Sequence, residues 1–565
     1  MASGTSIIEK LDLQLSHLLS GWNIYTTVLA LFLLLFVAYP LLVWAEPDTH
    51  PMLLARQAYP SRVRQPRESA VYRSLETPHE YPLRTGLGVR DPGTPKYGRG
   101  RDGDLRDIWT QALKGYVGPD GEASPQRGRI LTVLGKEEVV EHNLDDMSRE
   151  INIIGQKVRH HGGKRVAVYL PNSTELLSTV FASAFYQFTP ILLPYDQSLD
   201  TIAEFLQKTQ PDFLVAAAGV FPLSDLVEQY AGLKEIIWVV EQGSRHMDWN
   251  ENVGNSRGSL EVSVWHNVVE ENERAAVNEL PSGQPSDEST NLVTIWQKEK
   301  HDSGEIIEFS QDNLIAGVAA LISFLPVRQR LGPSDLFLPA DSLTFIYPLT
   351  HTLAALFSNS SIAFNSVSGP EADLALATRS VAPTVVVASP DSVFRTFGKG
   401  AYQNKGPLTA TKYWRHSRAL AEGRMPKGAL DRAAPAVGNT PGKLRLIYVS
   451  ERASTKASPL SSARLSDIRI FTGARVIYAL TAPKVAGAVA QTNLFDYRRE
   501  KSDSSHFGVP LSSLEIKLVD TETHKTVEDQ APQGEIVVKG PAVVGGEAAL
   551  GVLGTFRDDH TLAYA

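Results

Sequence analysis

The longest apolar stretch of the chain lies near its N-terminus and contains no charged residue. It runs from Ile24 to Ala45 with the sequence IYTTVLALFLLLFVAYPLLVWA. At about 1.5 Å per residue, a helix of this length covers the roughly 30 Å hydrocarbon thickness of a bilayer. Trp22 and Trp44 stand at its two ends, where indole rings prefer the membrane interface. The pattern predicts a transmembrane helix over 22–45.

A cleaved signal peptide and a buried soluble helix are the alternatives to a membrane anchor. A signal peptide has a basic start and a shorter apolar run, whereas Glu9, Lys10 and Asp12 precede this long one. The positive-inside rule places residues 1–21 outside or in the lumen and the body in the cytosol. We therefore expect a single-pass protein in the bilayer of the endoplasmic reticulum. The basic residues that set this orientation follow the apolar run and are Arg56, Arg62, Arg64, Arg67 and Arg73.

The next part of the chain, 46–128, is rich in Pro, Gly, Arg and Asp and has little periodicity. Only 104–117, DLRDIWTQALKGYV, has the spacing of a short helix. We interpret 46–128 as a juxtamembrane tether.

From residue 129 onward, strand-like and helix-like patterns alternate. Strands are expected at 129–135, 165–171, 189–195, 212–218, 233–241, 291–296, 381–389, 444–450 and 474–480, and helices at 144–162, 174–188, 201–210 and 313–325. Such alternation predicts parallel βαβ units, and therefore an α/β domain over 129–495.

Three segments depart from this alternation. The polar stretch 242–290 is expected to be a surface insertion, and 398–440 is basic and loop-like. The strands 514–520 and 534–540, separated by turns, predict a small antiparallel β-rich subdomain over 496–565. The predicted fold is therefore α/β, with parallel layers and a small antiparallel unit behind one membrane helix.

Composition removes several classes of function. The 565 residues contain no cysteine, which excludes disulfides, thiolate metal sites and a cysteine nucleophile. A net charge of −8 argues against a nucleic-acid partner. No GxSxG, HExxH, Walker A or Rossmann glycine motif stands in a usable context.

Four blocks between 129 and 565 resemble the AMP-forming adenylating superfamily, and among its branches the membrane-anchored long-chain fatty acyl-CoA synthetases. The blocks are VAVYLPNSTELLSTVFASAFYQFTPILLPY, YPLTHTLAALFSNSSIAFNS, FGVPLSSLEIKLVD and GEIVVKGPAVV, in the family's order and at matching spacing. The resemblance implies a large α/β domain. It also implies use of ATP, Mg²⁺ and coenzyme A, if the chemistry is retained.

The phosphate loop expected from this resemblance is degenerate. The family's "TSGTTG.PKG" loop falls on 297–305, where the chain reads QKEKHDSGE. Glu305 stands at the family's lysine, and Gly304 is the one glycine left. Close backbone approach to a triphosphate needs small residues and many amide donors, so the loop is expected not to bind one.

The remaining nucleotide motifs are degenerate as well. The family's "YG.TE" reads YALTA, so Tyr478 and Thr481 persist as vestigial nucleotide-site residues while Ala482 replaces the glutamate. Alanine offers no oxygen to a magnesium ion. Val552 stands at the ribose aspartate and cannot bond two hydroxyls.

Two further departures concern the acyl pocket and the lid. The "GgA" turn becomes 450–453, SERA, and the chain ends at Ala565 before the family's C-terminal lid domain, which we expect to be absent. His351 is the one family polar position clearly kept. If the chain is active, His351 and Thr481 are the candidate catalytic residues; otherwise His351 is a packed histidine.

These observations favour a pseudoenzyme that binds a fatty acyl ligand or a protein partner and needs no cofactor. The first alternative is an active long-chain fatty acid–CoA ligase that uses ATP, Mg²⁺ and CoA. The second is a scaffold subunit of a membrane complex, which would dock partners through 242–290 and 398–440.

Overall fold

The computed structural model describes most of the chain. The described residues are 16, 20–43, 46–90, 98, 100–116, 124, 126–134, 138–240, 260–272, 279–281, 290–397, 407–426, 443–455, 459–499, 504–526 and 531–565, without the side chains of 39–43, 134 and 407–409. The residues divide into two compact units, Met1–Thr49 and His50–Ala565.

The first unit holds helix α2 (Ile24–Val43), which covers most of the predicted membrane segment. The expected tail over 1–21 and the end of that segment, 39–45, lie largely outside the described residues or side chains. A search of the described part of the chain finds no helix both long and apolar enough to cross a bilayer.

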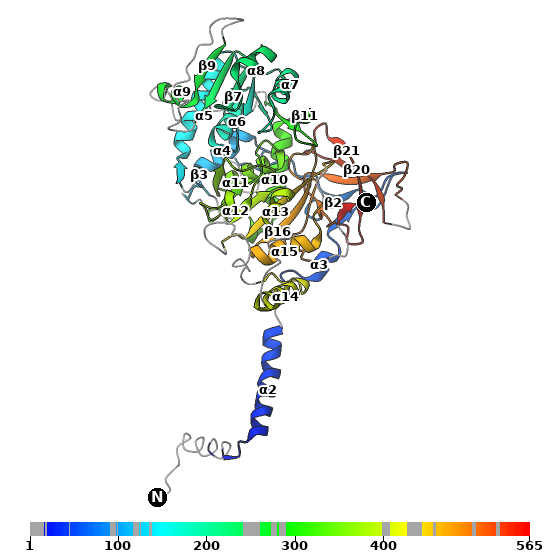
Figure 1. The fold of residues 1–565 in the computed structure, drawn as a ribbon. Helices are drawn as coiled ribbons and strands as arrows, with labels where there is room; N and C mark the ends of the chain where they lie inside the picture. The colour runs from blue at the N-terminus through cyan, green and yellow to red at the C-terminus, as the bar shows by residue number, and fades with distance from the viewer. Residues whose placement is uncertain are drawn as a thin grey trace. The chain divides into compact units, whose positions relative to one another are not determined.

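The second unit contains two mainly parallel sheets, as the alternation of elements predicts. The seven-stranded sheet has the order β11-β10-β6-β5-β7-β8-β9, and the nine-stranded sheet has the order β18-β17-β16-β15-β14-β12-β13-β3-β4 (Figure 1). Only the strands at their ends pair antiparallel: β11 with β10, β4 with β3, and β17 and β18 beyond β16. The α/β prediction is confirmed in these two layers.

The elements of the first sheet follow the sequence pattern closely. Buried apolar strands alternate with helices that begin at Ser or Asn caps, such as Ser173, Ser198 and Ser310. The elements are α5 (Leu144–His160), β5 (Arg165–Tyr169), α6 (Thr174–Tyr186), β6 (Thr189–Leu192), α7 (Leu199–Thr209), β7 (Phe213–Ala217), α8 (Leu223–Gln229), β8 (Glu235–Val239), β9 (Glu261–Val264), α9 (Trp265–Asn272), β10 (Leu292–Trp296), β11 (Glu305–Phe309) and α10 (Gln311–Phe324).

The second sheet is built from the strands β3 (Ile130–Leu134), β4 (Glu138–His142), β12 (Leu336–Pro339), β13 (Ser361–Asn365), β14 (Val385–Ala388), β15 (Leu446–Arg452), β16 (Arg475–Thr481), β17 (Ala490–Gln491) and β18 (Val509–Pro510). The helices among them are α11 (Ile346–Phe357), α12 (Leu374–Ala377), α13 (Pro390–Phe397), α14 (Pro407–Ala421) and α15 (Ser462–Thr472). One continuous apolar core reaches both parallel sheets.

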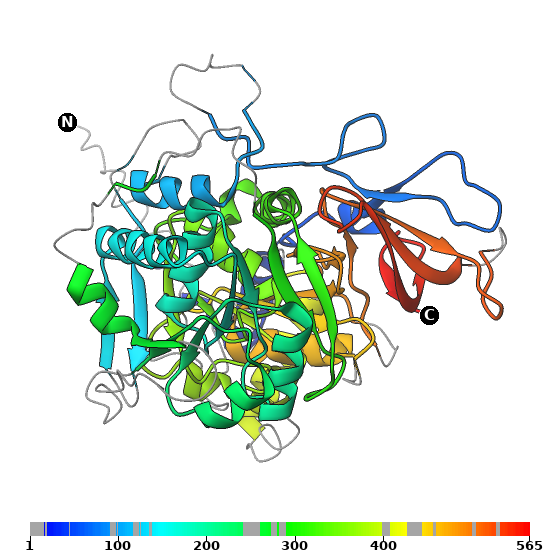
Figure 2. The same ribbon diagram turned by 90° about the horizontal axis from the view of Figure 1, so that it is seen from above.

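The predicted tether, 46–128, is largely part of the body. It supplies α3 (Pro51–Ala55), β1 (Ala58–Pro60), β2 (Tyr72–Ser74) and α4 (Leu105–Lys114). β2 pairs with β19 (Glu515–Val519), which places β1 and β2 at the edge of the C-terminal antiparallel sheet (Figure 2). The other strands of that sheet are β20 (Gln533–Lys539), β21 (Glu547–Phe556) and β22 (Leu562–Tyr564).

Two segments contain more structure than their composition predicts. The polar stretch 242–290 includes β9 and α9, although 241–259, 273–278 and 282–289 lie outside the described residues. The basic segment 398–440 contains helix α14. The antiparallel pairing of β19 with β20 was expected, and the structure confirms it.

Candidate functional site

The principal candidate site is a cavity of about 460 Å³ where β10, β15 and β16 end. The loop after β10, the residues that follow β15 and β16, and one part of β21 form its walls. The lining residues are Trp296, Lys298, Asp302, Ser303, Gly304, Glu305, Ser454, Pro483, Lys484, Ala548, Ala549, Leu550 and Gly551. The segment 297–305, in which the resemblance places the family's phosphate loop, therefore supplies several of the lining residues.

The loop 297–304 is tied to the connection between β6 and α7, since β6 pairs with β10. Gln297 Nε2 donates to Gln197 Oε1 at 3.1 Å, and the backbone N–H of His301 donates to the same oxygen at 3.2 Å. The Lys300 ammonium lies 2.5 Å from the Asp196 carboxylate. These contacts turn one backbone amide and one cation of the loop toward the protein, so neither faces the cavity as a phosphate donor.

Gly304 remains for a reason that does not involve a ligand. Its φ of +62° lies in the left-handed region. A Cβ there would lie 2.6 Å from Ile295 Cγ2 and 3.1 Å from the Trp296 carbonyl oxygen. The left-handed backbone and the close approach to Ile295 and Trp296 explain this glycine, which ends the loop between the antiparallel strands β10 and β11.

The cavity rim carries balanced charge. Glu305, at the family's lysine position, pairs with Lys484, whose ammonium lies 3.2 Å from the carboxylate. Lys298 and Asp302 also line the cavity and carry opposite charges. An anion-binding cradle requires a surplus of donors, and this rim has no such surplus among its lining side chains.

Arg452, at the end of β15, lies beneath the rim. Its guanidinium carbon is 4.4 Å from the ring centre of Trp296 and 4.1 Å from that of Phe345, and it donates to the Gln297 carbonyl oxygen at 2.9 Å. No partner for Arg452 Nε is present among the described residues. The arginine thus joins β15 to the end of β10 through Trp296 and the Gln297 carbonyl, and to the start of α11 through Phe345.

Burial changes the proton affinity of the groups near Arg452. Desolvation lowers the pKa of Arg452 itself to about 10 and raises the pKa of the Asp341 carboxyl to about 6. The Ser342 backbone N–H, which donates to Asp341 Oδ1 at 2.8 Å, and the charge of Arg452 both oppose that rise.

Tyr478 and Thr481 lie together, but away from the cavity lining. The Tyr478 hydroxyl donates to Glu451 Oε2 at 2.8 Å and accepts from the Leu460 N–H at 3.0 Å, and Thr481 Oγ1 donates to the Glu451 carbonyl oxygen at 2.9 Å. Burial raises the pKa of Glu451 to about 7, with the charge of Asp391 as a weaker cause. These two residues therefore serve the packing around Glu451.

Ala482 and Val552 stand where the resemblance requires carboxylates. Ala482 is fully buried, and Val552 packs against the main core. In the cavity wall, the strand β21 presents the neighbouring Leu550 and Gly551. The residues present do not fit a triphosphate with its magnesium ion, because these positions offer methyl groups instead of oxygen ligands.

His351 is an interior residue of α11, apart from the cavity. Its ring lies 4.5 Å from that of Tyr347 and 4.2 Å from that of Tyr448, and its Nε2 has no hydrogen-bond partner among the described residues. Burial lowers its pKa to about 3, so the imidazole is neutral at neutral pH. The structure does not bring His351 and Thr481 into one catalytic arrangement.

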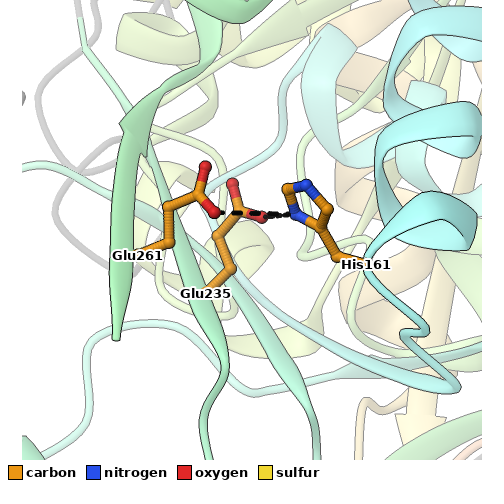
Figure 3. A group of neighbouring side chains, drawn as sticks. All are labelled: His161, Glu235 and Glu261. Atoms are coloured by element: carbon orange, nitrogen blue, oxygen red, sulfur yellow. Dashed lines mark hydrogen bonds and ion pairs between the residues drawn. The ribbon is translucent and has the colours of Figure 1, made fainter. Parts of the chain in front are cut away.

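A separate polar cluster joins α5, β8 and β9 (Figure 3). His161 Nδ1 lies 2.7 Å from Glu235 Oε2 and 3.8 Å from Glu261 Oε2. These are metal-ligand types at suitable spacing. Lys157 lies 2.8 Å from Glu235 and 3.3 Å from Glu261, and Ser263 donates to Glu235. The lysine supplies the positive charge that a metal would bring, so ion pairing accounts for the cluster.

The sequence pattern did not reveal three contributors to the site: Gln197, Asp341 and Lys484. Arg452 was visible in the sequence as part of 450–453, SERA, which departs from the family's "GgA" turn. Gln197 and Asp341 reach the site from distant segments, and no local pattern marks them.

The sequence is similar to one known protein family and to one yeast protein. Residues 307–546 match the family described as AMP-binding enzyme. The YHR045W protein of Saccharomyces cerevisiae is 21% identical over 528 residues, which cover 87% of this chain and 85% of that protein.

Solved structures share the fold at low identity. The long-chain-fatty-acid–CoA ligase FadD1 of Archaeoglobus fulgidus has a TM-score of 0.55 and 14% identity, over 86% of each chain. The anthranilate CoA ligase AuaEII, in complex with anthranoyl-AMP, has a TM-score of 0.56 and 15% identity, over 82% of this chain and 77% of that chain. The chain has the α/β fold of acyl- and aryl-CoA ligases.

Proposed function

We propose that this chain, whose residues 307–546 carry an AMP-binding domain of the adenylating superfamily, is a pseudoenzyme that binds without forming an adenylate. One observation carries the proposal: the loop 297–304 is bonded to Asp196 and Gln197 where the family presents a phosphate cradle. Phosphoryl and adenylyl transfer depend on positioning and charge, and this loop offers neither to a triphosphate.

The proposed ligand is an acyl chain or a protein partner in lipid metabolism. The AMP-binding match and the fold support an acyl ligand, because solved proteins of this fold include a long-chain-fatty-acid–CoA ligase. The partly apolar cavity, with Trp296, Pro483 and Leu550 in its walls, supports the same choice.

The decisive experiment for this proposal is a pyrophosphate-release assay. The full chain is mixed with ATP, Mg²⁺, CoA and a long-chain fatty acid, beside the Archaeoglobus FadD1 enzyme as positive control. We expect pyrophosphate at the level of the enzyme-free blank, and saturable binding of a fluorescent long-chain fatty acid by the same preparation. Acid-dependent pyrophosphate release by this chain would refute the pseudoenzyme proposal.

An active ligase is the second candidate function. Lys298 and Lys484 favour it, because both ammonium groups border the cavity and would attract an anionic substrate. In that case, replacing both lysines by alanine abolishes pyrophosphate release, whereas the exposed Lys525→Ala variant leaves it unchanged.

We also propose that the apolar segment 24–45 holds the chain on a bilayer, with the body in the cytosol and the endoplasmic reticulum as the expected membrane. The absence of charge from the segment and the exposure of Phe32 and Phe36 on α2 support this. Alkaline extraction of isolated membranes tests it. Release of the chain into the soluble fraction would contradict anchoring.

A further inference from the structure

The basic segment 398–443 has a charge opposite to that of the whole chain. It contains nine Lys or Arg residues and two Asp or Glu residues, whereas the chain carries a net charge of −8. Helix α14 forms its described part. Three of the nine basic residues, Lys412, Arg415 and Arg418, lie on this helix, which contains no acidic residue.

One side of α14 is fixed to the body. Leu420 packs with Ile470, Phe471 and Tyr497 in a small apolar cluster. The Tyr413 hydroxyl donates to the Asp467 carboxylate at 2.6 Å. These contacts hold the helix in one orientation and determine which of its residues face outward.

The outward side of α14 combines basic groups with an exposed indole. Trp414 is 61% exposed, and Lys412, Arg415 and Arg418 are exposed around it. The guanidinium of Arg418 lies 5.7 Å from the Trp414 ring and pairs with Glu422, the single acidic residue of 410–425. A tryptophan surrounded by Lys and Arg on a helix is typical of a segment that lies in a lipid interface.

Helix α3 adds apolar groups at the same end of the body. Met52 is 72% exposed and Leu53 is 60% exposed. The loop 496–499 fastens both helices: Asp496 accepts from Gln57, next to α3, and Arg499 donates to Ser417 of α14 (Figure 1).

We propose that the α14 surface, formed by Met52, Leu53, Lys412, Trp414, Arg415 and Arg418, docks on the anionic headgroups of a lipid bilayer. The exposed indole and the two apolar side chains insert at the interface, while the cations pair with lipid phosphates and carboxylates. Chain continuity also favours lipid over an acidic protein or nucleic acid, because the uncharged segment 24–45 ends just before α3. This inference is independent of whether the cavity is catalytic.

A single fluorescent label tests the proposal, because the chain has no cysteine of its own. Ala421→Cys places an environment-sensitive dye on the exposed stripe of α14, seven residues beyond Trp414. The matched control is Glu228→Cys on α8, an exposed position at the far end of the body (Figure 1). The labelled full chain is titrated with phosphatidylcholine vesicles, with and without phosphatidylserine.

We expect a blue shift of the Ala421→Cys label with phosphatidylserine vesicles only, reversal by salt, and no shift of the control label. Lys412→Glu with Arg415→Glu should weaken the response at least about tenfold, since each basic group near an anionic surface contributes to binding. The salt reversal is measured on the labelled chain that keeps Lys412 and Arg415. The proposal can therefore still be tested if the Lys412→Glu, Arg415→Glu variant fails to fold. An equal response to uncharged vesicles, no response, or a stronger response to short RNA or an acidic polypeptide would each overturn the proposal.

Discussion

The buried region behind the cavity and the rim of the cavity differ in how they hold polar groups. The buried region, called the floor below, contains Asp341, His351, Glu451 and Tyr478; these residues do not line the cavity, and burial dominates the behaviour of their side chains. The rim, defined by 297–305, 483–484 and 548–551, is more open and carries exposed ion pairs such as Glu305–Lys484. The floor is part of the core of the CoA-ligase fold, whereas polar groups of the rim pair with one another or with Asp196 and Gln197.

This difference separates the requirements of folding from those of chemistry. The floor joins β15 and β16, so its loss would damage the core. The rim contributes less buried area, so its residues change at small cost in free energy. The fold therefore depends on the floor more than on the contacts that the rim makes.

Removing Arg452 should produce the largest effect, because it is the residue that joins floor and rim. Arg452→Ala deletes two cation–π contacts and a hydrogen bond to Gln297, and it leaves Asp341 without that cation. We expect a loss of about 3 kcal/mol in the free energy of unfolding, measured by urea denaturation. The exposed Arg395→Ala variant, which breaks only the pair with Glu371, should lose less than about 0.5 kcal/mol. Equal losses in the two variants would contradict the linking role of Arg452.

The pH dependence of the free energy of unfolding should depend on the buried titratable groups of the floor. Burial raises the pKa of Glu451 to about 7 and of Asp341 to about 6. In the folded state these acids bind protons that the unfolded chain releases near pH 4.5 for Glu451 and near pH 3.8 for Asp341, so the stabilisation is present below those values and is lost as the pH rises to about 7 and about 6, respectively. His351 acts in the opposite sense, because its lowered pKa favours folding above about pH 6.5.

Glu451→Gln isolates one of these contributions. The substitution removes the titration of this carboxyl. Between about pH 5 and about pH 8, we expect the free energy of unfolding of the variant, measured by urea denaturation, to change by roughly 1–2 kcal/mol less than that of the natural chain. The exposed Glu228→Gln variant serves as control. An unchanged pH profile in Glu451→Gln would show that the buried carboxyl does not titrate in this range.

Releasing the loop 297–304 from Gln197 should lower the free energy of unfolding less than Arg452→Ala does. The structural effect should be confined to the rim. Gln197→Ala removes the acceptor for Gln297 and for the His301 backbone N–H. We expect a loss of about 1 kcal/mol and faster hydrogen exchange at the His301 amide. Gln207→Ala, which removes an exposed donor to the Gln229 carbonyl, should leave that exchange unchanged. Unaltered exchange in Gln197→Ala would mean that other contacts hold the loop.

The smallest expected effect concerns the His161 cluster. Here Lys157 forms ion pairs with acidic side chains, as Lys484 does with Glu305 at the rim. Lys157→Ala removes the ammonium that lies 2.8 Å from Glu235. We expect Zn²⁺ binding, measured by calorimetry, to become at least about tenfold tighter than in the natural chain. The double variant Lys157→Ala with His161→Ala should lose this gain. Tight Zn²⁺ binding by the natural chain would contradict the ion-pair interpretation.

The sequence predicted the layers of the body because buried strands and amphipathic helices leave strong periodic signals. The runs RVAVYLP and LRLIYVS become the central strands β5 and β15. The pairing of β2 with β19 was not predicted, because their residues are more than four hundred positions apart and β2 has only three residues. Helix α14 was missed because its charges obscure the apolar contacts of Leu420.

The site was predicted in part. The loop 297–305, which the motif comparison singled out, lines the cavity, and the burial of Ala482 was not predicted. The hydrogen bonds of His301 to Gln197 and of Arg452 to Gln297 depend on how distant segments pack, which no local pattern encodes. The sequence predicts that nucleotide contacts are missing, and the structure shows which contacts the corresponding loop makes with Asp196 and Gln197.

A calorimetric titration of the full chain with ATP and Mg²⁺ tests the central claim most directly. The account predicts no saturable heat, because Gln197 and Asp196 hold the loop and Ala482 and Val552 supply no oxygen ligands. The exposed Lys525→Ala variant should behave in the same way. Saturable, magnesium-dependent ATP binding that is lost in Lys298→Ala with Lys484→Ala would contradict the account, because it would place a functional nucleotide in this cavity.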